Sequence, residues 1–241
     1  MPHAEFRFKQ FIVRQDKCAM KVGTDGVLLG AWAACNNCKR VLDIGTGTGL
    51  IALMMAQKCP NAEIFAIDID SVAYRQANEN FGFSPWSSRL HALHESLQQF
   101  ALLSGEKFDL IISNPPFFMD AHPASNEARN VARHMDESLS IIELCEGVKK
   151  LLSPDGKFCV IFPYREGMRF LEYASANNLF IERITKVKTK VEKQEKRLLM
   201  EFGLTHKQTV EEELVIQEED LSFTQQYIDL TADFYLALGN R

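Results

Sequence analysis

Short apolar segments alternate with helix-forming segments along most of this chain, and this alternation constrains the fold more than any other feature. Segments rich in Val, Ile, Leu and Phe are typical of strands that a parallel sheet buries on both faces. Strands are predicted at 40–44, 63–67, 89–93, 108–113 and 157–162. Helices are predicted at 50–57, 71–81 and 137–152, the second capped by Ser71 and the last ended by the turn-forming run 153–156. This alternation of predicted strands and helices along the chain predicts βαβ units.

The last third of the chain follows a different pattern. Residues 179–187 and 197–204 are strand-like and joined by a charged connection, which predicts an antiparallel hairpin at the edge of the sheet. Residues 234–238 are expected to form a short final strand or a helical turn. No Pro-, Gly- or Ser-rich linker divides the chain. We therefore expect one structural domain, with an N-terminal extension over 1–39 and an α/β unit over 40–241 whose sheet has seven strands and helices on both faces.

Composition excludes several classes of protein. The chain has 27 Lys and Arg against 32 Asp and Glu, a net charge of −5 that argues against a general DNA-coating role. Its longest apolar stretch, 26–35, is about half of the roughly 18 residues that span a bilayer, and the N-terminus lacks the apolar core of a signal peptide. We expect a cytoplasmic protein that does not bind membranes.

The six cysteines are scattered, so reduced and mostly buried thiols are expected. Cys35 and Cys38 form a C-x-x-C, but no second pair follows at zinc-ligand spacing. No metal site is predicted.

A glycine-rich loop, Asp43-Ile-Gly-Thr-Gly-Thr-Gly49, follows a buried predicted strand and precedes a helix. Gly45, Gly47 and Gly49 permit a sharp turn and let a ligand lie against the backbone. The next strand ends at Asp68, 19 residues after Gly49, the usual spacing of a carboxylate that binds ribose hydroxyls. The pair predicts a nucleoside cofactor site, with Thr46 and Ile69 as adjoining contacts.

Two residues distinguish this loop from a dinucleotide site. Leu50 stands where a dinucleotide fingerprint has its third small residue, and Asp43 would repel a pyrophosphate but suit the ammonium of a methionine moiety. The pattern D-x-G-x-G-x-G resembles motif I of the class I S-adenosylmethionine-dependent methyltransferases, and the order of motifs extends the resemblance over about residues 20–165. It implies a Rossmann-like class I methyltransferase fold and S-adenosyl-L-methionine as cofactor.

Asn114-Pro-Pro-Phe117 ends the fourth predicted strand. Ligands in an open α/β sheet bind outside the carboxyl ends of the strands, so this run should face the same crevice as the glycine loop. Pro115 and Pro116 hold the backbone extended and remove two amide donors. The Asn114 side-chain oxygen and the Pro115 carbonyl remain as acceptors for a planar amino group, and Phe117 offers a stacking face.

This run resembles the (N/D)PP(Y/F) signature of methyltransferases that act on planar amino or amide nitrogens. The family mechanism uses two acceptors that favour a tetrahedral nitrogen, so they stabilise the transition state more than the ground state. It requires no metal and no strong base. The resemblance implies that Asn114, Pro115, Pro116 and Phe117 form the catalytic site, with Asn114 also contacting the cofactor.

Residues 8–13 and 18–32 resemble the opening of the bacterial tRNA1(Val) (adenine-N6)-methyltransferase group, which modifies the adenosine beside the anticodon. That resemblance implies that Thr24 and Asp25 open a helix lining the methionine end of the cofactor; from the residues alone, either is a plausible N-cap. Ser96 stands where an acid often contacts the cofactor adenine, so this contact departs from the wider pattern.

Local charge favours an RNA substrate more than the total charge does. Residues 183–197 contain seven Lys or Arg and two Glu, whereas 211–220 contain six acids and no base. The long connection 120–136 is predicted to be a substrate-side lid, although a solvated loop with incidental charges fits equally well. The candidate substrate contacts are Arg129, Arg133, Lys186, Lys188 and Lys190. No stable protein partner is implied.

The preferred function is N6-methylation of an adenosine in tRNA, with adenosine 37 of tRNA1(Val) as the expected target. Glutamine methylation of release factors is an alternative. The enzymes that catalyse it resemble NPPY more than NPPF and carry an N-terminal helical domain that residues 1–39 do not supply. Guanine-N2 methylation of ribosomal RNA is another, although its NPPF run commonly occurs in a longer, duplicated chain. A scaffold without activity would be expected to show damage in one of the two motifs, and both are intact.

Overall fold

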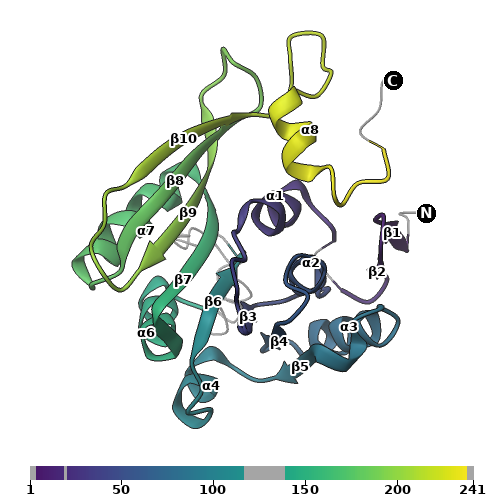
Figure 1. Cartoon of the computed structure of the whole chain (residues 1–241), viewed down its shortest axis with the longest axis vertical. Coiled ribbons are helices and arrows are strands. Elements are labelled where there is room, and N and C mark those ends of the chain that lie inside the picture. Colours follow the sequence, from purple (N-terminus) through teal and green to yellow (C-terminus); the bar gives the residue numbers. More distant parts are fainter. Residues whose placement is uncertain (1–3, 19–20, 117–138, 238–241) are drawn as a thin grey trace, which may run out of the picture.

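The computed structural model describes residues 4–18, 21–116 and 139–237, and its centre is an eight-stranded sheet (Figure 1). Within it, β9 alone runs antiparallel to its neighbours. In sheet order the strands are β10 (Val210–Val215), β8 (Phe180–Lys188), β9 (Glu195–Gly203), β7 (Leu152–Pro163), β6 (Phe108–Ser113), β3 (Arg40–Ile44), β4 (Glu63–Asp68) and β5 (Leu90–His94). This confirms the predicted α/β fold, the mostly parallel sheet and the antiparallel β8–β9 hairpin.

The eighth strand corrects the prediction of seven. β10 has the sequence Val-Glu-Glu-Glu-Leu-Val, and its consecutive glutamates hide the alternation that identifies a half-buried strand. It pairs in parallel with β8, where Glu211 and Glu213 form ion pairs with Lys186 (3.0 Å) and Lys188 (2.6 Å). Cross-strand charge pairs therefore accompany a strand whose one buried side chain is Leu214.

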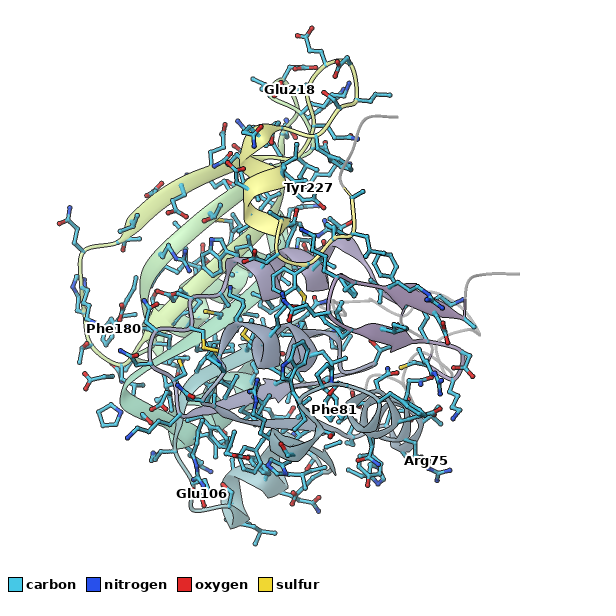
Figure 2. The ribbon with its side chains drawn as sticks, turned by 45° about the vertical axis from the view of Figure 1, so that its right-hand side comes forward. Arg75, Phe81, Glu106, Phe180, Glu218 and Tyr227 are labelled. Atoms are coloured by element: carbon cyan, nitrogen blue, oxygen red, sulfur yellow. A yellow bond between two sulfur atoms is a disulfide. The ribbon has the colours of Figure 1, made fainter. Side chains whose placement is uncertain are left out.

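Helices cover both faces of the sheet (Figure 1). One face carries α1 (Thr24–Trp32), α2 (Leu50–Lys58) and α3 (Ser71–Gly82), and the other carries α4 (Leu97–Leu103), α6 (Ile141–Leu151) and α7 (Tyr164–Ala176). Adjacent strand residues supply different cores: Val41 packs in the α1–α3 core and Leu42 in the α4–α7 core. Figure 2 shows the two sides of one of these helices: Phe81 of α3 points inward and Arg75 points outward.

Helix ends depart from the predictions at three places. The N-cap of α3 is Asp70, whose side chain accepts from the Val72 amide, and Ser71 is the first helical residue. α6 begins at Ile141 behind a capping box of Ser140 and Glu143, later than the apolar spacing suggested. The turn-like run 153–156 belongs to β7, which begins directly after α6.

A small hairpin, β1 (Glu5–Arg7) and β2 (Ile12–Arg14), flanks α3 and meets the end of the described chain. Phe8 bridges to Tyr235, their rings stack with centroids 5.9 Å apart, and the Lys9 amide donates to the Phe234 carbonyl (2.8 Å). The predicted final strand or turn is thus an isolated bridge, reached through α8 (Gln225–Thr231). Within the described residues no helix is long and apolar enough to cross a membrane.

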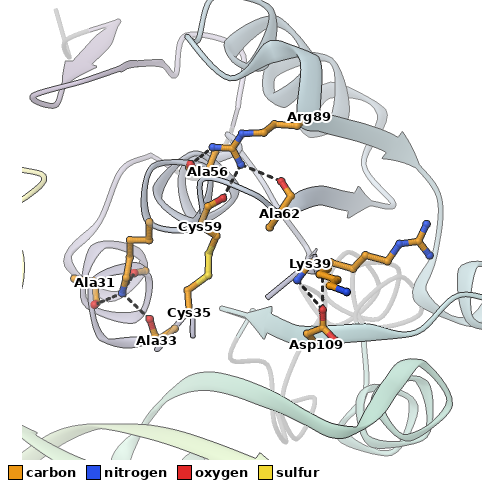
Figure 3. The surroundings of a disulfide bond; sticks show 12 residues. Ala31, Ala33, Cys35, Lys39, Ala56, Cys59, Ala62, Arg89 and Asp109 are labelled. Atoms are coloured by element: carbon orange, nitrogen blue, oxygen red, sulfur yellow. Dashed lines mark hydrogen bonds between the residues drawn. A yellow bond between two sulfur atoms is a disulfide. The ribbon is translucent and has the colours of Figure 1, made fainter. Parts of the chain in front are cut away.

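A disulfide between Cys35 and Cys59 joins the segment after α1 to the end of α2, with Cα atoms 5.9 Å apart (Figure 3). This corrects the expectation that all cysteines are reduced thiols; Cys38, the other half of the C-x-x-C, is a free thiol. Beside the disulfide, the Lys58 ammonium donates to the Ala31 and Ala33 carbonyls (2.6 and 2.5 Å) and so satisfies the end of α1. Burial lowers the pKa of Lys58 to about 8.

Candidate active site

A cavity of about 420 Å³ opens at the carboxyl ends of β3, β4, β5 and β6. Parallel strands bring their carboxyl ends to one edge, where ligands of open α/β sheets bind. Its walls come from the glycine loop, the segments after β4, β5 and β6, and the start of α6. The lining residues are Cys18, Ile44, Gly45, Gly47, Ile67, Asp68, Ile69, Asp70, Ala73, Glu95, Ser96, Leu97, Gln98, Ser113, Asn114, Pro115, Pro116, Leu139 and Glu143.

The glycine loop has a backbone that only glycine adopts without strain. Gly45, Gly47 and Gly49 have φ of +69°, +58° and +81°. A Cβ on Gly45 or Gly47 would meet no atom within 4 Å, so at these two positions the conformation alone requires glycine and leaves open space above the backbone. At Gly49 a Cβ would also lie 2.6 Å from the Phe81 ring, so α3 packs directly on the loop.

Asp43 lies behind the loop, fully buried and outside the cavity lining. Its Oδ2 accepts from the Thr46 hydroxyl (2.6 Å) and the Ala52 amide (3.2 Å), which joins the loop to the first turn of α2. Its Oδ1 is buried without a hydrogen-bond partner among the described residues. Burial raises the pKa of Asp43 to about 7. A cation nearby would favour the charged form of this carboxylate.

Asp68 ends β4 and lines the cavity. Its two carboxylate oxygens accept from the Gly47 amide (2.8 Å) and the Asp70 amide (2.9 Å), so the side chain is held in one orientation beside the loop. Burial raises its pKa. Each oxygen has a second lone pair available, which suits a diol.

Asn114 follows β6 directly, beside the glycine loop that follows the neighbouring strand β3. The Ser113 hydroxyl donates to the Ile44 carbonyl (2.9 Å), which joins the ends of β6 and β3. The Asn114 Oδ1 atom is buried and has no hydrogen-bond partner within the described residues, although its residue lines the cavity. Pro115 is buried and Pro116 exposed. Asn114 thus lines the cavity with an unsatisfied acceptor that is buried in its wall, while Phe117 lies outside the described residues.

The wall after β5 contains a residue that the sequence reasoning missed. Ser96 lines the cavity as expected, and its hydroxyl caps α4 by accepting from the Gln99 amide (3.3 Å). Glu95, directly before it, also lines the cavity. An acid is therefore present at this wall, one residue earlier than the superfamily pattern suggested. Its place directly after β5, one residue beyond the position that pairs with Asp68, is the signal that identifies it.

Thr24 and Asp25 begin α1, but neither lines the cavity. The N-cap is Gly23, which corrects the prediction of a Thr24 or Asp25 cap. The Asp25 carboxylate pairs with the Arg197 guanidinium of β9 at 2.8 Å. The N-terminal region instead reaches the cavity through Cys18, which sequence reasoning did not select.

The candidate substrate lysines lie on and after β8, and two of them are paired with acids. Lys186 and Lys188 face Glu211 and Glu213 of β10, so less positive charge is exposed than the local count suggested. Lys190 donates to the Glu219 carbonyl (2.9 Å), and its charge is close enough to Asp220 to contribute to the lowered pKa of that carboxyl. Arg129 and Arg133 lie outside the described residues.

The arrangement fits a nucleoside cofactor that carries positive charge. An open glycine backbone, a strand-end carboxylate and a buried aspartate share one end of the sheet with an unsatisfied amide oxygen. Among the described residues no group of His, Cys, Asp or Glu is arranged to hold a metal ion. What the geometry offers is binding, orientation and hydrogen-bond acceptance.

Comparison with known proteins points in the same direction. A family model described as the methyltransferase small domain matches residues 23–194. A tRNA1(Val) (adenine(37)-N6)-methyltransferase of Bacteroides fragilis is 46% identical over 237 residues, covering 97% of this chain and 98% of that protein. A protein of the same name from Christiangramia forsetii is 44% identical over 241 residues, covering 99% and 100%. The crystal structure of a predicted O-methyltransferase from Agrobacterium tumefaciens superimposes with a TM-score of 0.69 at 17% identity, covering 87% of this chain and 96% of that one, which shows a shared fold.

Proposed function

The chain belongs to the tRNA1(Val) (adenine(37)-N6)-methyltransferase family, and we propose on that premise that it methylates N6 of adenosine 37 in tRNA1(Val). The main structural support for methylation of an amino group is the side-chain oxygen of Asn114. This oxygen is buried, has no hydrogen-bond partner among the described residues, and belongs to a residue that lines the cavity beside the glycine loop. An exocyclic amino group would supply the missing donor. The names of the relatives support the choice of tRNA as the substrate.

S-adenosyl-L-methionine is the cofactor of this family, and when bound it supplies an electrophilic methyl group on a sulfonium. We propose that Gly45 and Gly47, which line the cavity, present their backbone to it, that Thr46 and Gly49 shape the loop from outside the lining, and that Asp68 binds the ribose hydroxyls. Ile69, which is 55% exposed, and Ser96 would contact the adenine, with Glu95 beside them. Asp43 acts from behind the loop through its charge, and Thr24 and Asp25 act through the placement of α1.

The proposed catalytic step depends on hydrogen-bond acceptance. An adenine amino group is a weak nucleophile because its lone pair is delocalised into the ring. The Asn114 Oδ1 and the Pro115 carbonyl would each accept one of its hydrogens and favour a tetrahedral nitrogen, which stabilises the transition state more than the ground state. Pro116 keeps this backbone extended, and Phe117 is proposed to stack on the base.

The assignment is tested by mass spectrometry of the product. Total tRNA from a strain lacking the activity is incubated with the protein and labelled S-adenosylmethionine, then digested to nucleosides. We expect N6-methyladenosine confined to one tRNA species. Label that appears in ribosomal RNA or in a release factor instead would overturn the substrate and leave the fold and cofactor standing.

The affinity for S-adenosylmethionine is expected to rise with pH through about 7. Asp43 has a folded pKa of about 7 against an ordinary value of 3.8, so its contribution to the free energy of unfolding declines between pH about 4 and about 7 and is lowest above 7. A cofactor with sulfonium and ammonium charges favours the ionised carboxylate, so binding near neutral pH should release a proton. Calorimetry in two buffers of different protonation enthalpy measures that release, and Asp43→Asn should reduce it. Uptake of a proton on binding, or binding with no net release or uptake of protons, would contradict the expected role of Asp43.

Lys190 is expected to contribute more to tRNA binding than Lys186, since Lys186 forms a direct ion pair with Glu211 whereas Lys190 has only a weaker electrostatic interaction with Asp220. Lys190→Gln should raise the KM for tRNA by roughly threefold to tenfold and reduce the slope of log KM against log salt by about one. Lys186→Gln serves as the matched control with a smaller expected effect. Equal effects of the two changes would argue against a phosphate contact at Lys190.

A further inference from the structure

Asn80 on α3 joins two segments that are distant in the sequence. It is 1% exposed, and its amide nitrogen donates to the Thr48 carbonyl (2.8 Å) and to the Arg14 carbonyl (2.9 Å). Its amide oxygen accepts from the Arg14 amide (2.9 Å). The side chain therefore has a partner for each of its hydrogens and for its oxygen, in a buried place where a lost bond is costly.

The Thr48 contact completes a pattern in the glycine loop. Asp43 holds the Thr46 hydroxyl, and Asp68 holds the Gly47 amide. The carbonyl of Thr48 is held by Asn80. Three consecutive residues of the loop are thus fixed by side chains from three different elements, between glycines with left-handed backbones. Because such a loop has more freedom than most chain segments, each of these bonds reduces the entropy that cofactor binding has to remove.

The Arg14 contacts connect the same side chain to the N-terminal segment, residues 12–18. This segment ends at Cys18, in the wall of the cavity. One turn earlier on α3, Gln76 is fully buried and its side-chain oxygen accepts from the Lys17 amide (3.0 Å). Its amide nitrogen has no partner among the described residues. Gln76 and Asn80 therefore both hold the N-terminal segment, but only Asn80 is also bonded to the glycine loop.

We propose that Asn80 is a positioning residue for cofactor binding, which holds the second half of the glycine loop in its binding conformation and joins it to the N-terminal wall of the cavity. Asn80 acts through Thr48 and does not itself line the cavity. Its loss should therefore affect the affinity for S-adenosylmethionine and not the chemical step. The proposal rests on the cofactor rather than on the RNA, so its first measurement, the Kd for S-adenosylmethionine, needs no tRNA substrate.

The test compares Asn80→Ala with Gln76→Ala in the full chain. Both substitutions remove a buried side-chain amide of α3 that is hydrogen-bonded to the N-terminal segment. Calorimetry gives the Kd for S-adenosylmethionine, thermal unfolding confirms the folded state, and kinetics give the KM for the cofactor and kcat. Asn80→Ala is expected to raise the Kd and the cofactor KM about tenfold, with kcat at saturating cofactor within about twofold of wild type. Gln76→Ala should leave the Kd within about twofold.

Asn80→Asp provides a second measurement that a general loss of packing would not reproduce, and it replaces Asn80→Ala if that variant does not fold. The carboxylate can still accept from the Arg14 amide but cannot donate to the Thr48 carbonyl until it is protonated. The ratio of its Kd to that of wild type should fall as the pH is lowered. Equal weakening by Asn80→Ala and Gln76→Ala, or a wild-type Kd in the Asn80 variants, would overturn the proposal.

Discussion

Asn114→Ala is expected to lower kcat for methyl transfer about 10²- to 10³-fold, the range observed when one preorganised hydrogen-bonding group is removed from an active site. The Asn114 Oδ1 is buried and unpartnered among the described residues, so it is available to a substrate amino group without breaking another bond. Alanine removes this acceptor but leaves Pro115 and the end of β6 in place. Single-turnover kinetics at saturating S-adenosylmethionine and tRNA measures the change.

Two controls separate chemistry from binding in this experiment. The Kd for S-adenosylmethionine should change by no more than about tenfold in Asn114→Ala, because Asp68 and the glycine loop are untouched. Asn114→Asp retains an acceptor and the (N/D)PP(Y/F) pattern, so it should be more active than the alanine variant. A kcat near wild type in Asn114→Ala would exclude the proposed catalytic role.

Asp68→Asn is expected to raise the Kd for S-adenosylmethionine about a hundredfold, or ~2.7 kcal/mol. A carboxylate accepts from ribose hydroxyls through charge-assisted bonds, which are stronger than neutral ones. The substitution also removes one of the two acceptors that hold the Gly47 and Asp70 amides, so the loop is less well ordered. Isothermal titration of the protein with cofactor measures the loss without any RNA.

Asp109→Asn is the matched control for Asp68→Asn. Asp109 also accepts from two backbone amides, those of Lys39 (2.8 Å) and Arg40 (3.1 Å), but near the amino end of β6, away from the cavity. Both substitutions should cost similar stability, about 1 kcal/mol in the free energy of unfolding. Only Asp68→Asn should weaken cofactor binding. A similar rise in Kd for both would show that the effect is structural.

Local pattern was enough to predict the elements that carry the cofactor site. β3 and β6 have the predicted bounds, and β4 and β5 differ from them by one residue, because buried parallel strands are continuous apolar runs. Gly45, Gly47 and Asp68 lie at the cavity as their spacing indicated. The chemistry of these positions depends on the strand and the turn that follows it, both of which are local.

Features that depend on distant partners could not be predicted in this way. The Cys35–Cys59 disulfide and the pairing of β10 with β8 join segments whose proximity only the folded chain creates. The cavity wall at Cys18 requires β2 to lie on α3, through contacts between residues 66 positions apart. Asn80 has no distinguishing local signal, since an asparagine in a helix is most often a surface residue.

The pairing of Phe8 and Lys9 with residues 232–235 has a consequence during synthesis of the protein. Lys9 and Ala232, which are bonded, lie 223 positions apart, and a ribosome adds about 5 to 20 residues each second, so roughly 10 to 45 s separate their appearance. All the described residues that line the cavity, up to Glu143, are synthesised in that interval, whereas Phe8 and Lys9 wait for their C-terminal partners. A nascent chain would therefore have its cofactor cavity available first and would close the contact between its two ends last, which makes this closure a late event in folding.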